Sequence, residues 1–330
     1  MQSQLLGMAV GKHSWMPSCV EQRDDAVSML SDEPIGYDLP AQRSPRGISR
    51  RGRRNLDAAR PRPMGSVSLV VPTLNEARNI GWLLERVPDY VDEIILVDGR
   101  STDGTVEVAR QLRPDIRVVL EERPGKGAAL RAGFEASRGD YIVMIDADGS
   151  MHPQETDLFT AYLDAGYDFV KGSRFMLSGG STDMTLIRRL GHWPLLTFTR
   201  VGFRVRFTDL CYGYCAFRRS TLEALSLRAD GFEIETELLL SAVRAGLTIA
   251  EVPSWESPRI SGESNLHALR DGTRVLKVLL RERFAPSRRP VGVVHDSAPK
   301  LIDLTERSSA HLARPRSSGS SSGTVPRTAR

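Results

Sequence analysis

The sequence predicts an α/β fold in which a mostly parallel sheet is flanked by helices. Between residues 67 and 145, short apolar runs alternate with segments of helical spacing. This alternation is typical of parallel strands joined by right-handed crossovers. Polar motifs directly follow three of the apolar runs, so their side chains are expected along one edge of the sheet, where open α/β sheets bind ligands.

The elements of the first half follow from local patterns. The run Val67–Val71 is continuously apolar, as expected for a strand buried on both faces. From Asn75 to Val87 the apolar residues recur on one helical face, which predicts a helix. The same criteria predict strands at Glu93–Val97, Ile116–Leu120, Tyr141–Ile145 and Phe169–Lys171, and helices at Gly104–Leu112, Lys126–Ser137 and from Pro153 onward.

Two later segments are apolar and basic together. Leu186–Phe207 contains Trp193 and five arginines but no acid, which suits either a membrane-surface segment or a buried helix pair with solvated arginines. Leu266–Phe284 has the spacing of an amphipathic helix packed on a core, with peripheral membrane contact as the alternative. Neither segment is apolar and long enough to span a bilayer.

Charge is distributed unevenly along the 330 residues. The ends are basic, with ten Lys and Arg against seven Asp and Glu in residues 1–65, and eight against three in residues 285–330. Residues 66–284 hold 27 basic and 31 acidic residues, which argues against nucleic-acid binding by this part. The Arg-rich extension 1–65 and the Ser- and Arg-rich tail 285–330 are predicted to be disordered, leaving one folded domain at 66–284.

The sequence also predicts a reducing compartment. Its three cysteines (Cys19, Cys211 and Cys215) form no disulfide framework, and no apolar segment of a secretory signal follows the first Met. We therefore expect a cytoplasmic protein.

Two polar motifs follow the first two predicted strands. Pro72-Thr73-Leu74-Asn75-Glu76 could be an ordinary turn with Asn75 as a helix cap. Asp98 could likewise be only a cap. However, a carboxylate at a strand end can also accept the ring N–H of uracil or guanine, with Ser101 opening the tight turn that follows.

Two further motifs combine a lysine and two acids. Gly125-Lys126-Gly127 lacks the Ser or Thr of a phosphate-binding P-loop, but Lys126 adds positive charge at a helix start, where backbone N–H groups already favour anions. Asp146 and Asp148 lack the further acids of a calcium loop. Two carboxylates so close together suit Mg²⁺ or Mn²⁺ shared with a diphosphate, although adjacent acids are also common on surfaces.

In this order the motifs resemble those of family 2 inverting glycosyltransferases of GT-A fold. The second half resembles the dolichyl- and polyprenyl-phosphate mannosyltransferase branch, through Gly172-Ser173-Arg174-Phe175, Asp209-Leu210, Ala216-Phe217-Arg218-Arg219 and Arg259 with Gly262, Ser264 and Asn265. The resemblance covers about Ser66–Arg283 and implies a Rossmann-like nucleotide-diphospho-sugar transferase fold. Gly99 stands where many members have a second Asp, and Asn265 replaces a common Lys.

The resemblance also implies roles for individual residues. The nucleotide sugar would be bound by Pro72, Asn75, Glu76, Asp98, Ser101, Lys126 and Asp146. The metal would be held by Asp146 and Asp148. The catalytic set would comprise Asp148, Arg174 and Arg259, the two arginines binding phosphate, together with an acid that is either Glu237 or Glu235.

The implied activity is inverting transfer of a sugar from GDP-mannose or a UDP-hexose to polyprenyl or dolichyl phosphate, with Mg²⁺ or Mn²⁺ as cofactor. A lipid-phosphate acceptor would bring the protein to the inner face of the cell membrane as a peripheral protein. The alternative is a hydroxyl acceptor in polysaccharide or glycolipid synthesis, which would need Glu235 or Glu237 as a base. A third interpretation is a nucleotide-binding module without catalysis. It is disfavoured because such a module has little need of both Asp146 and Asp148.

Overall fold

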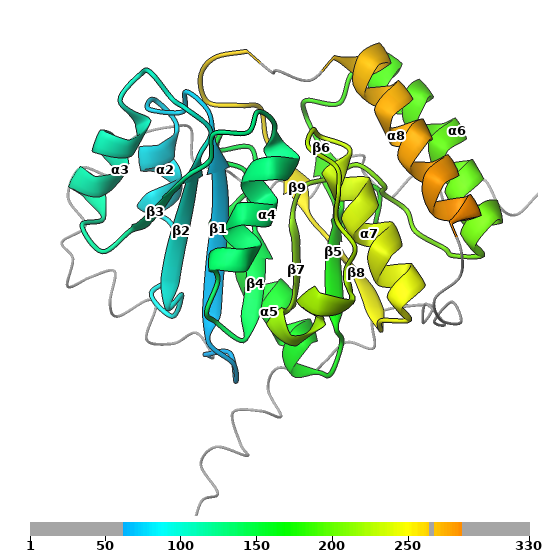
Figure 1. The fold of residues 1–330 in the computed structure, drawn as a ribbon, viewed down its shortest axis with the longest axis horizontal. Coiled ribbons are helices and arrows are strands. Elements are labelled where there is room, and N and C mark those ends of the chain that lie inside the picture. The colour runs from blue at the N-terminus through cyan, green and yellow to red at the C-terminus, as the bar shows by residue number, and fades with distance from the viewer. Residues whose placement is uncertain (1–61, 264–266, 286–330) are drawn as a thin grey trace, which may run out of the picture. The chain divides into compact units, whose positions relative to one another are not determined.

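A computed structural model describes residues 62–263 and 267–285. Its centre is a seven-stranded sheet of order β3-β2-β1-β4-β7-β5-β8, in which β7 alone runs antiparallel to its neighbours (Figure 1). A mostly parallel α/β sheet is thereby confirmed. The strands are β1 Val67–Thr73, β2 Glu93–Asp98, β3 Arg117–Leu120, β4 Tyr141–Met144, β5 Phe169–Ser173, β7 Cys215–Arg218 and β8 Ile249–Pro253, and a separate pair joins β6 Gly180–Ser181 to β9 Trp255–Glu256.

Helices cover both faces of the sheet. In β1, Val70 packs in one buried cluster while Leu69 and Val71 pack in the other, as expected when successive side chains of a central strand alternate. The first cluster includes residues of α4, α6, α7 and α8, and the second includes residues of α2, α3 and α5. The helices are α2 Ile80–Leu84, α3 Thr105–Leu112, α4 Lys126–Ala136, α5 Thr156–Asp164, α6 Leu186–Phe203, α7 Ile234–Ala245 and α8 Ala268–Phe284, with short 3₁₀ turns at Pro153–Glu155 and Arg219–Ala224.

The antiparallel strand β7 was not predicted as a strand. It lies between β4 and β5, where Val143 is paired with Ala216 and Lys171 with Cys215. Because β7 runs against its neighbours, its first residues meet the carboxyl ends of β4 and β5. The loop that precedes Cys215 therefore arrives at the same edge of the sheet as the motif after β4.

The helix predicted from Asn75 to Val87 is shorter than expected. Asn75 has a positive φ of 59°, which is incompatible with a helix interior. The Ser101 hydroxyl accepts a hydrogen bond from the Asn75 N–H at 2.8 Å, and Asp103 accepts one from the Ala77 N–H at 2.9 Å. The chain after β1 is thus held as a turn by side chains that follow β2, and α2 begins only at Ile80.

The described residues cover nearly all of the predicted folded domain and almost none of its two ends. The sheet and helices occupy the predicted range 66–284 wherever the structure describes it. The extension 1–65 and the tail 285–330 lie outside the described residues, apart from residues 62–65 and Ala285. Disorder of the two ends stays a prediction.

Helix α4 lies unusually close to the sheet at Gly133. A Cβ atom added there would come 2.4 Å from Cγ1 of Val70 and 2.8 Å from Cγ2 of Val97. We expect Gly133→Ala to lower the free energy of unfolding by about 1–2 kcal/mol, because the clash with two stiff side chains outweighs the better helix propensity of Ala. Urea unfolding measures the change.

The matched control is Gly272→Ala in α8, where a Cβ atom would meet nothing within 4 Å. At Gly272 only the helix propensity of the residue changes, so the same substitution should raise the free energy of unfolding by up to about 1 kcal/mol. Equal effects at the two positions would contradict the close packing of α4.

Candidate active site

The polar motifs meet at the carboxyl edge of the sheet. The strands β1, β2 and β4 end at Thr73, Asp98 and Met144, so the residues that follow them lie along one edge. The antiparallel β7 adds the loop before Cys215, as described above. The result is a row of acids with lysine and arginine partners drawn from both halves of the sequence.

The ammonium group of Lys126 is the centre of this row. Its Nζ lies 2.6 Å from Oδ1 of Asp146 and donates a hydrogen bond to Oε1 of Glu235, also at 2.6 Å. Burial opposes the charged form, but the two carboxylates raise the pKa of Lys126. Gly213 lies against the group, since a Cβ atom there would come 2.9 Å from Glu235 Oε1 and 3.0 Å from Lys126 Nζ.

The glycines beside Lys126 have a structural explanation. A Cβ atom at Gly125 or at Gly127 would come within about 2.2 Å of backbone atoms in residues 229 and 230. The Gly127 N–H donates to the Asp230 carbonyl at 2.7 Å, and Gly125 has a φ of 111°. The two glycines let the loop before α7 pack on the start of α4. In this structure Lys126 binds carboxylates, and its predicted place near a base or phosphate stays a prediction.

A second group joins the motifs after β1 and β4. Arg259 forms an ion pair with Oε1 of Glu76, and its Nη1 lies 3.7 Å from Oδ2 of Asp148. Burial raises the pKa of Glu76, while the hydrogen bond from Asn79 acts against it. The segment that carries Arg259 is fixed by backbone contact, because the Ile260 N–H donates to the Asp148 carbonyl at 3.1 Å. The structure therefore brings three predicted residues into one ion-pair group.

The predicted nucleoside-binding residues form a third group. The buried Asp98 accepts hydrogen bonds from the Ser101 N–H at 2.9 Å and from the Thr73 hydroxyl at 3.3 Å. Asn75 accepts one from the Thr102 N–H at 2.9 Å and is itself held by Ser101. Pro72 is the register partner of Val97, beside this group. These contacts are those of a turn, so recognition of a base by Asp98 stays a prediction.

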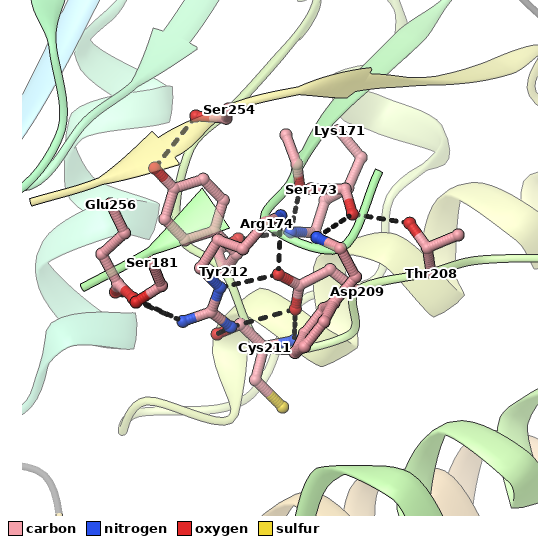
Figure 2. A network of polar contacts seen from close by, with 12 residues as sticks. Lys171, Ser173, Arg174, Ser181, Thr208, Asp209, Cys211, Tyr212, Ser254 and Glu256 are labelled. Atoms are coloured by element: carbon pink, nitrogen blue, oxygen red, sulfur yellow. Dashed lines mark hydrogen bonds and ion pairs between the residues drawn. The ribbon is translucent and has the colours of Figure 1, made fainter. Parts of the chain in front are cut away.

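Arg174 lies in a separate buried network. Figure 2 shows its guanidinium facing Asp209, which accepts from Nε at 2.7 Å and from Nη2 at 3.0 Å. Its Nη1 donates to Glu256 at 3.1 Å, and Nη2 donates to the Cys211 carbonyl at 3.1 Å. Burial acts in the opposite direction, yet the guanidinium lowers the pKa of Asp209. Arg174 thus anchors the loop before β7 to β5 and β9, and phosphate binding by Arg174 stays a prediction.

The two candidate acids of α7 have different surroundings. Glu235 faces Lys126, as described above. Glu237 is completely buried and accepts hydrogen bonds from the N–H groups of Arg228 at 2.8 Å and Ala229 at 2.7 Å. It also forms an ion pair with Arg281 of α8. Glu237 therefore fixes the loop before α7 to α8, and Glu235 is the acid that lies at the sheet edge.

Comparison with the sequences of known proteins assigns this chain to a family. The sequence profile described as "Glycosyl transferase family 2" matches residues 68–226. Glycosyltransferase AglJ of Haloferax volcanii is 34% identical over 224 residues, which are 66% of this chain and 71% of that protein. This chain belongs to glycosyltransferase family 2. Polyprenol monophosphomannose synthase of Mycolicibacterium smegmatis is 32% identical over 223 residues, 64% of this chain and 84% of that one.

Solved structures agree with the GT-A fold of this glycosyltransferase. Glucosyl-3-phosphoglycerate synthase from Mycobacterium tuberculosis, in complex with Mn²⁺, UDP and glucosyl-3-phosphoglycerate, is 28% identical with a TM-score of 0.55. The match covers 75% of this chain and 88% of that one. The glycosyltransferase and fold predictions are both confirmed. Among residues 62–263 and 267–285, none of the helices has the length and apolar composition needed to cross a membrane.

Contacts at the sheet edge were harder to predict than the motifs themselves, and Gly213 had no signal in the sequence. Gly213 is one of many glycines, and only its contact with Lys126 and Glu235 distinguishes it. Asp209 was noticed as part of a motif, but its bidentate pairing with Arg174 comes from packing across 35 positions. Ser264 and Asn265, which contributed to the resemblance, lie outside the described residues.

Asp146 should titrate well above an ordinary aspartate. Burial is the main cause that raises its pKa to about 6; Lys126 acts against it, and Glu235 and Asp148 add to it. The pKa of an aspartate in an unfolded chain is about 4, so between about pH 4 and 6 this carboxyl is protonated more often in the folded state than in the unfolded state. The stability that it contributes therefore falls as pH rises from about 4 to about 6. NMR of ¹³C-labelled aspartate measures the titration.

Glu235→Gln provides a directional check on this titration. The substitution removes a negative neighbour and leaves Lys126 to Asp146 alone, so the pKa of Asp146 should fall. An unchanged or higher pKa in that variant would show that the three groups are not coupled as described.

Proposed function

We propose that this glycosyltransferase moves a sugar from a nucleotide sugar to polyprenyl phosphate, with inversion and with a divalent cation. The bond from the anomeric carbon to the acceptor oxygen would form as the bond to the nucleoside diphosphate breaks. The name of the Mycolicibacterium smegmatis relative supports the acceptor class. The UDP complexes of the Mycobacterium tuberculosis structure support a nucleotide-sugar donor.

Asp146 and Asp148 are suited to hold the cation. They offer carboxylate oxygens at the carboxyl end of β4, the ligand type that Mg²⁺ and Mn²⁺ prefer. Within the described ranges no three His, Cys, Asp or Glu side chains form a ready-made metal cage, so donor phosphates and water would complete the coordination. When bound, the cation would supply positive charge to the leaving diphosphate. The Mn²⁺ in the related structure supports this reading without deciding between Mg²⁺ and Mn²⁺.

The remaining site residues would bind and orient the donor. Arg259, beside Asp148, would add positive charge near the diphosphate. Glu76, Asn75 and Pro72 would line the nucleoside pocket together with Asp98 and Ser101. To bind a phosphate, Arg259 must give up its ion pair with Glu76. We therefore expect a donor phosphate to replace the Glu76 carboxylate as the partner of Arg259.

The choice between the two classes of acceptor rests on the contacts of the two candidate acids. Glu237 is occupied by two backbone N–H groups and Arg281, and Oε1 of Glu235 is occupied by Lys126. A hydroxyl acceptor would have to give a proton to one of them. A lipid phosphate is already ionised and needs no base, which is why we favour it. Such an acceptor would place the protein at the cytoplasmic face of the cell membrane.

A hydroxyl acceptor is the second candidate. The related Mycobacterium tuberculosis enzyme was solved with phosphoglyceric acid, a small acceptor-like molecule that carries both a hydroxyl and a phosphate. Glu235 lies at the sheet edge and would be the base in that case.

The transfer assay uses purified protein, Mg²⁺ or Mn²⁺, polyprenyl phosphate, and radiolabelled GDP-mannose or a UDP-hexose. We expect label in the organic phase, and a loss of at least about 100-fold in Asp148→Ala because a cation ligand is removed. The control Asp115→Ala removes an exposed acid that pairs with Arg113 and should leave transfer unchanged. Label that stays aqueous while nucleoside diphosphate is released would reject the lipid acceptor.

Isosteric changes at the two acids separate their roles. Glu235→Gln should keep polyprenyl-phosphate transfer within about tenfold, because no base is required; a base would cost about 10²–10⁴-fold. Glu237→Gln should instead lower the free energy of unfolding by about 2 kcal/mol or more, since it breaks a buried pair. Single-turnover rates and urea unfolding measure the two effects. A rate loss of about 10²-fold or more in Glu235→Gln, without loss of stability, would contradict transfer without a base and would favour the hydroxyl acceptor.

A further inference from the structure

Helix α6 has two apolar stripes. Its inward stripe includes Leu196 and Phe203, which are buried in the core shared with α7 and α8. Its outward stripe contains Leu190, Trp193 and Val201, whose exposed fractions are 62%, 57% and 75%. The spacing of three and eight residues keeps these three side chains on one face of the helix. Packing on a protein core uses only one stripe, so the second lacks a partner among the described residues.

Helix α8, which packs beside α6, also carries exposed apolar side chains. Val275 and Leu279 are buried, whereas Leu276, Leu280 and Phe284 are exposed at 40%, 39% and 75%. The two helices lie side by side in Figure 1, and α6 packs on α8. A Cβ atom at Gly202 would lie 3.7 Å from Cδ of Arg283, so their carboxyl ends are adjacent. The α6–α8 surface is defined here by Leu190, Trp193, Val201, Leu276, Leu280 and Phe284.

The two segments that carry this surface are each net positive. Residues 186–207 contain five arginines and no acid, and α8 contains five basic residues and two acids. Residues 66–284 as a whole are net negative, so the basic charge is concentrated on these two segments. A second copy of the chain would bring the same positive surface against it, which like-charge repulsion disfavours. An anionic surface is favoured instead.

A hollow at the end of α6 combines the same two properties. A cavity of about 550 Å³ is lined by Arg200, Val201, Arg204, Val205 and Arg206. Arg200 is oriented by a hydrogen bond from Nε to the Phe207 carbonyl at 2.8 Å. Guanidinium groups match phosphate geometry, and Val201, which is 75% exposed, offers apolar contact beside them. The hollow suits the headgroup and upper chain of an anionic phospholipid.

We propose that the α6–α8 surface docks on an anionic lipid bilayer, with its apolar side chains in the interface and its arginines at the headgroups. Interfacial helices bind in this way through apolar area and attraction to anionic lipids together. The proposal specifies the surface by which the protein reaches a membrane and does not depend on the acceptor. Vesicles without polyprenyl phosphate therefore test docking separately from transfer.

The experiment uses the full-length protein with vesicles of phosphatidylcholine alone or mixed with phosphatidylglycerol. We expect cosedimentation with the anionic vesicles only, weakened by salt, and a blue shift of tryptophan fluorescence that is lost in Trp193→Phe. Arg204→Gln should weaken binding about fivefold, the effect of one surface charge. The double variant Val201→Ser with Phe284→Ser should weaken it roughly tenfold or more, through lost apolar area.

Matched controls lie outside the surface. Leu120→Ser, at a side chain that is 72% exposed on β3, and Arg110→Gln, on α3, should each bind anionic vesicles as the parent does. Urea unfolding verifies that every variant is folded. Equal binding to both vesicle types, equal losses in controls and variants, or a dimer that only the surface variants abolish would each overturn the proposal, the last by assigning the surface to a second copy.

Discussion

The site depends on one buried ammonium group. Lys126 bridges Asp146 after β4 and Glu235 of α7, and it thereby joins the parallel half of the sheet to the half built around β7. This bridge needs small residues around it, at Gly125 and Gly127 for the loop before α7 and at Gly213 for the loop before β7. One cation between two carboxylates leaves a surplus of negative charge at this edge. That surplus is complementary to a divalent cation.

The same pattern of internal neutralisation continues beside Lys126. Arg259 lies between Glu76 and Asp148, so these two acids, like Asp146, already have a basic neighbour. A metal–diphosphate group brings positive and negative charge together, and it could replace these contacts without leaving a buried charge alone. Ion pairs of this kind keep the acids in place before a ligand arrives, since removing one partner of a buried pair is costly.

The local part of this site could be predicted, and the rest could not. The acids and turns that follow β1, β2 and β4 were placed correctly at one edge, because parallel strands bring their carboxyl ends together. The choice between Glu235 and Glu237 could not be made, because residues two apart on a helix point to different sides and only packing decides which side is buried. Strand β7 has four residues, too few for a periodic signal. Its place between β4 and β5 brings the loop before β7, with Asp209, to Arg174 at the end of β5. Without β7 this contact could not be predicted.

The composition of helix α6 alone did not decide between two interpretations of this segment. The segment suited both a core helix and a membrane-surface helix, and the structure gives it an inward stripe and an outward one. The surface and the site are also linked by the chain. Only eight residues separate Arg259 from Ala268, where α8 begins, and so short a segment spans at most about 30 Å. If α8 rests on a bilayer, Arg259 must remain within that distance of the helix start. A phosphate acceptor anchored in the same bilayer would then need to rise only a limited distance to meet the donor.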